Sequence, residues 1–154
     1  MFRRSSVILA LVAVFGVVLT VPAGLAAEKK KTHTVDSAVQ AAAVAATSNG
    51  GAVVAGSVRD PAFGQGATVY RTTPAAGGVQ NSTFTAFFAA GTYKGTASVR
   101  STPQPDGSIR LDGTGRITGG TGRYRGAKGR FTISAGTILP DGSIAFTAKG
   151  TVRY

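Results

Sequence analysis

Side chains suited to catalysis are scarce in this chain of 154 residues. The absence of Cys excludes thiol nucleophiles, disulfides, Cys-ligated zinc and iron–sulfur clusters. The single His, His33, lies between Thr32 and Thr34 with no companion ligand nearby in the sequence. We therefore expect no metal site and no cofactor.

Most carboxylates beyond residue 51 have a structural explanation. Asp106 and Asp141 each lie between a Pro and a Gly, in turns where a carboxylate bonds its own backbone. Asp112 stands two residues from Arg110, which predicts a surface ion pair. Asp60 comes before a Pro at a strand end, where two roles stay open: it faces the mouth of a cavity, or it caps the loop.

Aromatic side chains offer a different chemistry, the wall of a site for a small apolar molecule. Phe84 and Phe88 alternate with Phe87, so this strand carries aromatic rings on both faces. Tyr70 and Tyr93 add hydroxyl groups that a ligand can bond. The predicted ligand-binding set is Asp60, Tyr70, Phe84, Phe88 and Tyr93. In the alternative, Phe84 and Phe88 belong to the core, Phe87 covers the outer surface or an interface, and the tyrosines pack at a rim.

The first 27 residues have the pattern of a cleavable secretory signal peptide. Two arginines precede an apolar run from Val7 to Val21, which is shorter than the roughly 20 residues of a membrane span. Small residues follow, and cleavage after Ala26 and cleavage after Ala27 fit equally well. An uncleaved N-terminal anchor is the alternative. We expect a secreted protein, and the richness in Ala, Gly, Val and Arg suggests a bacterial source.

The mature chain divides into a tail, residues 28–51, and a β domain, residues 52–154. The tail is Ala-rich and is expected to be flexible or briefly helical. Beyond it, short runs rich in Val, Ile, Thr, Phe and Tyr are separated by turn residues, which is typical of an all-β domain. The predicted strands are 52–59, 66–72, 79–90, 94–102, 108–118, 128–139 and 142–153.

An internal repeat marks two hairpins in the last four strands. Pro105-Asp106-Gly107-Ser108-Ile109 recurs 35 residues later as Pro140-Asp141-Gly142-Ser143-Ile144. Alternation then places one set of apolar residues on an inner face: Ile109, Leu111, Ile117, Phe131, Ile133, Ala135, Leu139, Ile144, Phe146, Ala148, Val152 and Tyr154. Successive antiparallel strands without helices hide such a face by closing, so we expect an antiparallel closed β-barrel.

The segment between these hairpins, residues 119–129, reads GGTGRYRGAKG. It resembles the Gly-Gly-Thr-Gly-[Lys/Arg]-aromatic-x-x-Ala-[Arg/Lys]-Gly motif of plant dirigent proteins and the related allene oxide cyclase barrels. The resemblance covers residues 113–130 and implies a barrel of about eight strands with a central cavity. It also implies a mainly architectural role for the motif residues: Gly119, Gly120, Thr121, Gly122, Tyr124, Gly126 and Gly129. A phosphate cradle is disfavoured, because no helix is predicted to follow the glycines.

Two functions stay open for such a barrel. In the first, its cavity binds a small apolar molecule or guides a reactive intermediate without a cofactor, as the resemblance implies. In the second, a non-enzymatic envelope or matrix protein has a barrel filled by Phe84, Phe88, Phe131, Phe146 and Tyr154. The net charge of +11 then serves solubility or contact with an anionic cell-envelope surface. Nucleic acid is not an expected partner, and association with further copies of the chain stays open.

Overall fold

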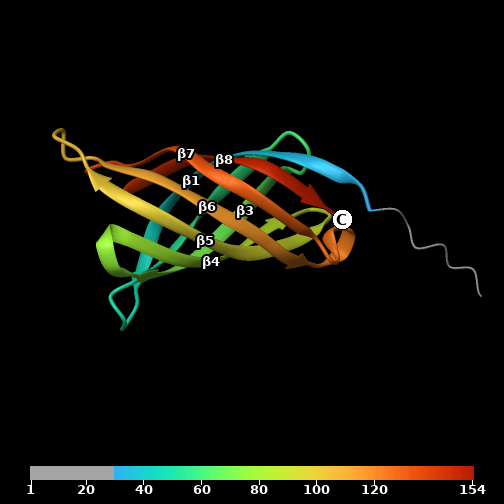
Figure 1. Ribbon diagram of the computed structural model, residues 1–154, viewed down its shortest axis with the longest axis horizontal. Helices are drawn as coiled ribbons and strands as arrows, with labels where there is room; N and C mark the ends of the chain where they lie inside the picture. The colour runs from blue at the N-terminus through green and yellow to red at the C-terminus, as the bar shows by residue number, and fades with distance from the viewer. Residues whose placement is uncertain (1–29) are drawn as a thin grey trace, which may run out of the picture.

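The structure, a computed structural model, describes residues 30–154 as a closed antiparallel β-barrel (Figure 1). Each strand bonds to the next along the chain, and β8 bonds back to β1. The strands are β1 (Thr32–Ala46), β2 (Ala52–Asp60), β3 (Gly64–Pro74), β4 (Val79–Phe88), β5 (Gly91–Pro103), β6 (Ile109–Gly120), β7 (Lys128–Ile138) and β8 (Ser143–Arg153). The expected eight-stranded barrel is confirmed. The predicted signal peptide lies outside the described residues.

β1 is formed by residues that the sequence pattern assigned to a tail. It pairs with β2 from Ala38 onward and with β8 from Thr32 to Ala42, so it closes the barrel. Val35, Ser37 and Val39 point inward and are buried, while the residues between them are exposed. The seven predicted strands agree closely with β2 to β8, and β1 is the strand that the prediction lacked.

The two repeated turns adopt the predicted geometry. In each, the Asp carboxylate accepts hydrogen bonds from the backbone NH and the hydroxyl of the Ser two residues later, at 3.0 and 2.7 Å for Asp106 and 2.8 and 2.6 Å for Asp141. The following glycines have φ of 81° and 83°, which L side chains rarely adopt. These hydrogen bonds from Ser108 and Ser143 hold the pKa of the two carboxyl groups below the ordinary value.

A bulge in β7 corrects two assignments to the inner face. The register of β7 against β8 shifts between Ser134 and Thr137, and Ala135 takes a positive φ of 50°. The extra residue reverses the alternation, so Ala135 and Leu139 are exposed and Ile138 turns inward. The inward positions predicted before the bulge, Phe131 and Ile133, are buried as expected.

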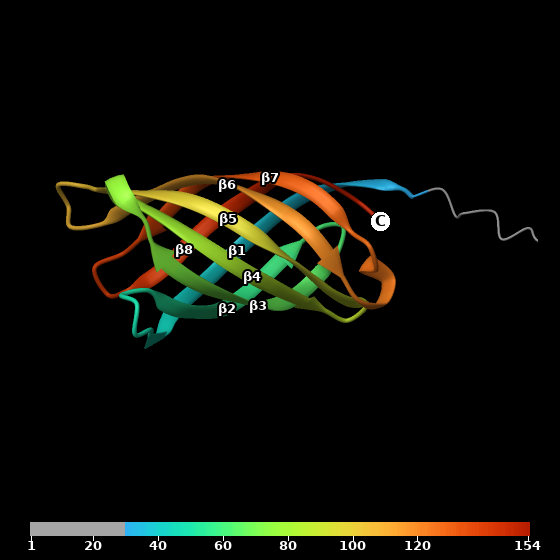
Figure 2. The ribbon, with the colours of Figure 1, turned by 60° about the horizontal axis from the view of Figure 1, so that its bottom comes forward.

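The two ends of the barrel differ, as Figures 1 and 2 show from two sides. One end holds the C-terminus and the turns that follow β2, β4 and β6, including the short 3₁₀ helix η2 (Gly122–Tyr124). The other end holds the turns after β1, β3, β5 and β7, including η1 (Ala76–Gly78). We call these the plugged end and the open end, because aromatic rings from turns cover the first, whereas the turns at the second contain no aromatic residue.

Aromatic rings seal the plugged end from two loops and the C-terminus. Phe63, in the turn between β2 and β3, lies with its ring centroid 5.6 Å from that of Tyr124 and 5.8 Å from that of Phe88. Tyr154 packs edge-on against Tyr124 at 5.1 Å, and His33 stacks on Tyr154 at 4.5 Å. Tyr124 is buried, as expected for a ring that plugs the barrel.

Candidate functional site at the open end of the barrel

The open end contains a small apolar cavity of about 70 Å³. Its walls come from seven of the eight strands: Val54, Tyr70, Thr72, Gln80, Ser82, Ala97, Val99, Leu111, Ile133, Ile138, Ile144 and Phe146. The polar groups gather on β3 and β4, opposite the aliphatic side chains of β6, β7 and β8. One wall can therefore bond a polar group of a ligand while the other packs against its apolar part.

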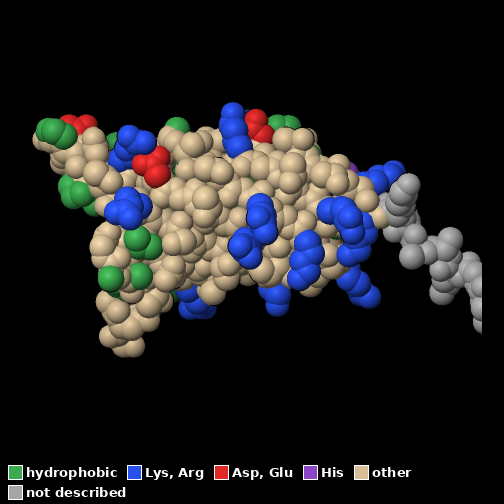
Figure 3. Space-filling view, in the orientation of Figure 1, with side chains coloured by type: hydrophobic (Ala, Val, Ile, Leu, Met, Phe, Trp, Pro, Cys, Tyr) green, Lys and Arg blue, Asp and Glu red, His purple; other side chains and the backbone are tan. Residues whose placement is uncertain are grey.

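The rim of this cavity leaves large apolar side chains partly in water. Val99, Ile138, Ile144 and Phe146 are neither fully buried nor fully exposed. Figure 3 shows exposed hydrophobic side chains gathered mainly toward the end where these strands meet their turns. Removing apolar surface from water stabilises a protein by about 25 cal/mol per Å². Binding of a partner that covers these side chains is therefore favourable.

Tyr70 is the polar aromatic residue of this site. Its ring contacts Phe146 at a centroid distance of 5.8 Å and Phe84 at 5.7 Å. Burial raises the pKa of Tyr70 to about 12, although a hydrogen bond to Thr68 acts in the opposite direction. The phenol is therefore protonated at physiological pH and can donate a hydrogen bond to a ligand.

The predicted ligand-binding residues are divided between the two ends of the barrel. Tyr70 lines the cavity, and Phe84 packs directly behind it without lining the cavity itself. Phe88 and Tyr93 belong to the aromatic plug, with their rings 5.4 Å apart. Phe87 points outward and is 45% exposed, which agrees with the alternative prediction for this strand.

Asp60 lies at the plugged end, far along β2 from the open mouth, and has the loop-capping role. Its side chain is 1% exposed. One carboxylate oxygen accepts bonds from the Ser37 hydroxyl at 2.7 Å and the Asp36 NH at 3.0 Å. The other accepts a bond from the Ala62 NH at 2.8 Å and so fixes the turn that carries Phe63. These bonds occupy the carboxylate, so it has a structural function.

The backbone around the glycine motif explains several of its glycines. Gly122 and Gly126 have positive φ of 56° and 71°. Gly120 does not, but a Cβ there would lie 2.5 Å from the carbonyl oxygens of Thr92 and Tyr124. Gly129 similarly has the Thr151 carbonyl oxygen where its Cβ would be. Close backbone approach, as well as positive φ, therefore explains these glycines.

Residues on several strands line the cavity although the sequence did not mark them as ligand contacts. Leu111, Ile133, Ile144 and Phe146 were expected only as core. The missing signal is the position of each residue along the barrel axis: alternation shows which side chains point inward, and the strand register decides at which end they lie. Ile138 was not among the residues expected on the inner face, because the bulge in β7 changes the alternation there.

Acid–base and metal-binding groups do not line the cavity. Its lining contains no carboxylate, imidazole or amine. Within residues 30–154, no group of three or more His, Cys, Asp or Glu side chains is placed to hold a metal ion. In the same residues, no helix is long and apolar enough to cross a membrane. The cavity can therefore bind and orient a molecule. Of the two aromatic residues in its lining, Tyr70 and Phe146, only Tyr70 can donate a proton.

The chain matches no protein-family model, no curated protein and no solved structure. The likeness to dirigent and allene oxide cyclase barrels therefore stays a prediction from the motif at residues 119–129.

Proposed function

We propose that this protein is a secreted barrel that binds the apolar end of a small molecule in its open mouth. The observation that carries the proposal is the asymmetry of the barrel. Phe63, Tyr124 and Tyr154 cover the core at one end, whereas Ile144 and Phe146 stay partly exposed around a cavity at the other. A purely structural barrel gains stability by covering both ends.

The size of the cavity defines what enters it. About 70 Å³ is well below the roughly 300–1,000 Å³ of a pocket that encloses a whole ligand. The interior farther down is occupied by Phe84, Phe131 and Tyr93. The ligand therefore inserts one apolar group, against Ile144 and Phe146, and the rest of it extends into solvent. Tyr70, Gln80 and Ser82 provide hydrogen bonds near the entrance.

This mode of binding needs no catalytic group. The only reaction it can assist is one that an oriented, reactive molecule undergoes by itself, because no base or metal ligand lines the cavity. Such guidance is what the dirigent-like resemblance implies. Holding a molecule without converting it is the simpler role, and the geometry supports it directly.

Native mass spectrometry of the protein purified from its own culture medium tests this proposal. We expect an additional mass from a retained small molecule, and expect it to be absent from the Ile144→Glu variant, which places a charge in the cavity. Leu139→Glu is the matched control, since Leu139 is exposed at the same end and outside the cavity. If each of the three proteins shows only the mass of its own chain, with no added ligand, the proposal is contradicted.

A second function is favoured by the small volume of the cavity. Phe84, Phe88 and Phe131 are buried inside the barrel, as a structural envelope protein with a filled barrel requires. In that case the role lies on the outer surface, and the apo result of the mass measurement supports it.

A further inference from the structure

The outer face of β3, β4, β5 and β6 is hollowed by two adjoining grooves. One, of about 460 Å³, is lined by Arg71, Thr73, Asn81, Ser82, Thr83, Thr96, Ala97, Ser98, Thr114, Gly115 and Arg116. The other, of about 500 Å³, shares Arg71, Thr83 and Thr96 with the first and continues to Lys94 and Phe87. Together they form one trough along β4 and β5, which we call the outer groove.

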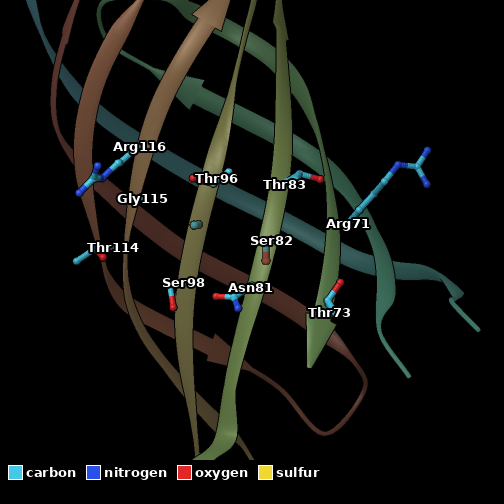
Figure 4. Close-up of a pocket in the computed structure, with 11 residues that line it drawn as sticks. Arg71, Thr73, Asn81, Ser82, Thr83, Thr96, Ser98, Thr114, Gly115 and Arg116 are labelled. Atoms are coloured by element: carbon cyan, nitrogen blue, oxygen red, sulfur yellow. The ribbon is translucent and has the colours of Figure 1, made fainter. Parts of the chain in front are cut away.

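Strand register builds the outer groove from rows of side chains. Arg71 is paired with Thr83, Thr83 with Thr96, and Thr96 with Arg116. These three steps between strands place the two arginines about 14 Å apart, at about 4.8 Å a step. In Figure 4 the arginines lie on opposite sides of the hydroxyl and amide side chains. The trough is hollow because short side chains stand between two long ones.

A second row runs beside the first, one pair of residues farther along the strands. It joins Thr73 to Asn81, Asn81 to Ser98, and Ser98 to Thr114. All four side chains offer hydroxyl or amide groups that both donate and accept hydrogen bonds. Such a floor suits a partner that is itself rich in hydroxyl groups.

The cations of the outer groove have no acidic partners. Among the described residues, the ion pairs are Arg110–Asp112 and Lys149–Asp36, and neither lies in the groove. No carboxylate lines either part of it. Arg71, Arg116 and Lys94 are therefore available to an anionic ligand. Figure 3 shows Lys and Arg side chains spread over the same barrel wall, with acidic groups confined to its upper edge and one end.

Phe87 adds an exposed aromatic ring where the groove ends. It is 45% exposed and lies across from Thr92 on β5. An aromatic face next to hydroxyl groups and sparse cations is suited to a sugar ring, whose CH groups pack on the aromatic face while its hydroxyls bond to polar side chains.

We propose that the outer groove binds an acidic polysaccharide. Its carboxylate groups bond to Arg71, Arg116 and Lys94, its hydroxyls bond to the Thr, Ser and Asn side chains, and one sugar packs on Phe87. Nucleic acid fits less well, because single strands are bound by stacking of successive bases on several aromatic rings, whereas this groove exposes one, Phe87. The outer groove and the cavity lie on opposite faces of the sheet and share only the buried residues Ser82 and Ala97, so this site does not depend on the proposed function.

Binding of alginate, a polymer of uronic acids, to the full chain tests this site. We expect binding to alginate and much weaker binding to dextran, which is neutral. The Arg71→Gln/Arg116→Gln variant should lose at least about tenfold in affinity, since each arginine forms a charge-assisted hydrogen bond. Arg125→Gln/Arg153→Gln removes the same charge outside the groove and should stay within about twofold of the original affinity. Phe87→Ser should also weaken binding, because it removes the aromatic contact.

Each outcome of this experiment decides something about the groove. Equal losses in the two double variants would mean that net charge alone attracts the polymer, and would overturn the site. Equal binding of dextran and alginate, or tighter binding of single-stranded DNA than of alginate, would overturn the proposed ligand class. A similar melting temperature for all variants is the control for folding.

Discussion

At the scale of one residue, Asp60 shows how a carboxylate of a type that can act in catalysis instead has a structural role. It is the one described carboxylate inside the barrel, and it accepts hydrogen bonds from Ser37, Asp36 and Ala62. The neighbouring Tyr93 phenol hydrogen-bonds to Ser37, and burial raises the pKa of Tyr93 strongly. Together these groups fix the turn that carries Phe63 into the plugged end.

Asp60→Ala should destabilise the protein by about 3 kcal/mol or more, because it leaves several buried donors without an acceptor. Asp112→Ala is the matched control: Asp112 forms an exposed pair with Arg110 at 2.8 Å, and its loss should cost about 0.5 kcal/mol or less. Urea denaturation of both variants measures the two free energies of unfolding. Equal small losses would show that Asp60 is not the structural group described here.

The tyrosines predict a loss of stability in alkali. Burial raises the pKa of Tyr70 from its ordinary value of 10.0 to about 12 and also raises the pKa of Tyr93. The folded state therefore keeps phenol protons that the unfolded state releases above pH 10, and the free energy of unfolding falls as pH rises from about 10 toward 12. Below pH 10 this contribution is complete and constant. The midpoint of urea denaturation, measured between pH 8 and pH 12, tests this prediction. A midpoint that does not change with pH would contradict it.

The sequence predicts the role of a single residue where the residues next to it in the chain determine that role. Phe63 and His33 do not meet this condition. The carboxylates of Asp106 and Asp141 bond to the backbone of their turns, and Asp112 pairs with Arg110, as the adjacent residues predicted. Phe63 was not predicted to be buried, because it lies in a turn and turn residues are expected to face water. Its ring packs into the plugged end. The stacking of His33 on Tyr154 was also missed, because it joins the two ends of the described chain.

At the scale of the element, the glycine motif shows how backbone contact limits side chains. A Cβ on Gly120 would lie 2.5 Å from two carbonyl oxygens, whereas a Cβ on Gly119 would meet only the end of the Lys94 side chain, at 3.8 Å. These neighbouring residues of β6 therefore differ in what they tolerate.

Gly120→Val should lower the melting temperature markedly, because the Thr92 and Tyr124 backbones must move to admit the side chain. Gly119→Val is the matched control and should change the melting temperature little, since the space beside Gly119 is open. Thermal unfolding followed by circular dichroism measures both. If the two variants lose the same stability, close approach at Gly120 is not what requires the glycine.

Most strands were predictable from alternation and turn residues, and β1 and the end of β7 were not. β1 ends in the run from Ala41 to Ala46, where alanine, which has little strand preference, dominates. Pairing with β2, and with β8 as far as Ala42, makes this run part of a strand. In β7 the bulge at Ala135 adds one residue to the alternation. β1 depends on pairing with β8 at the other end of the chain, and the bulge depends on how β7 pairs with β8, so no pattern within either strand shows them.

At the scale of the whole molecule, barrel closure separates three environments along and around one axis. The plugged end is a sealed aromatic core, the open end exposes apolar side chains around a cavity, and the outer wall carries cations and hydroxyls. Strand register decides where each environment lies along the barrel, so the resemblance that implied a cavity could not show at which end it lies.

Titration with N-phenyl-1-naphthylamine, a neutral apolar dye that fluoresces when it leaves water, is the most direct test of the open mouth. Its neutrality matters, because the net charge of +11 attracts anionic dyes to the outer surface. We predict saturable binding by the protein and by Leu139→Glu, and loss of binding by Ile144→Glu. Equal binding by Ile144→Glu and Leu139→Glu, or no binding by the unsubstituted protein, would contradict the assignment of a ligand site to the open end.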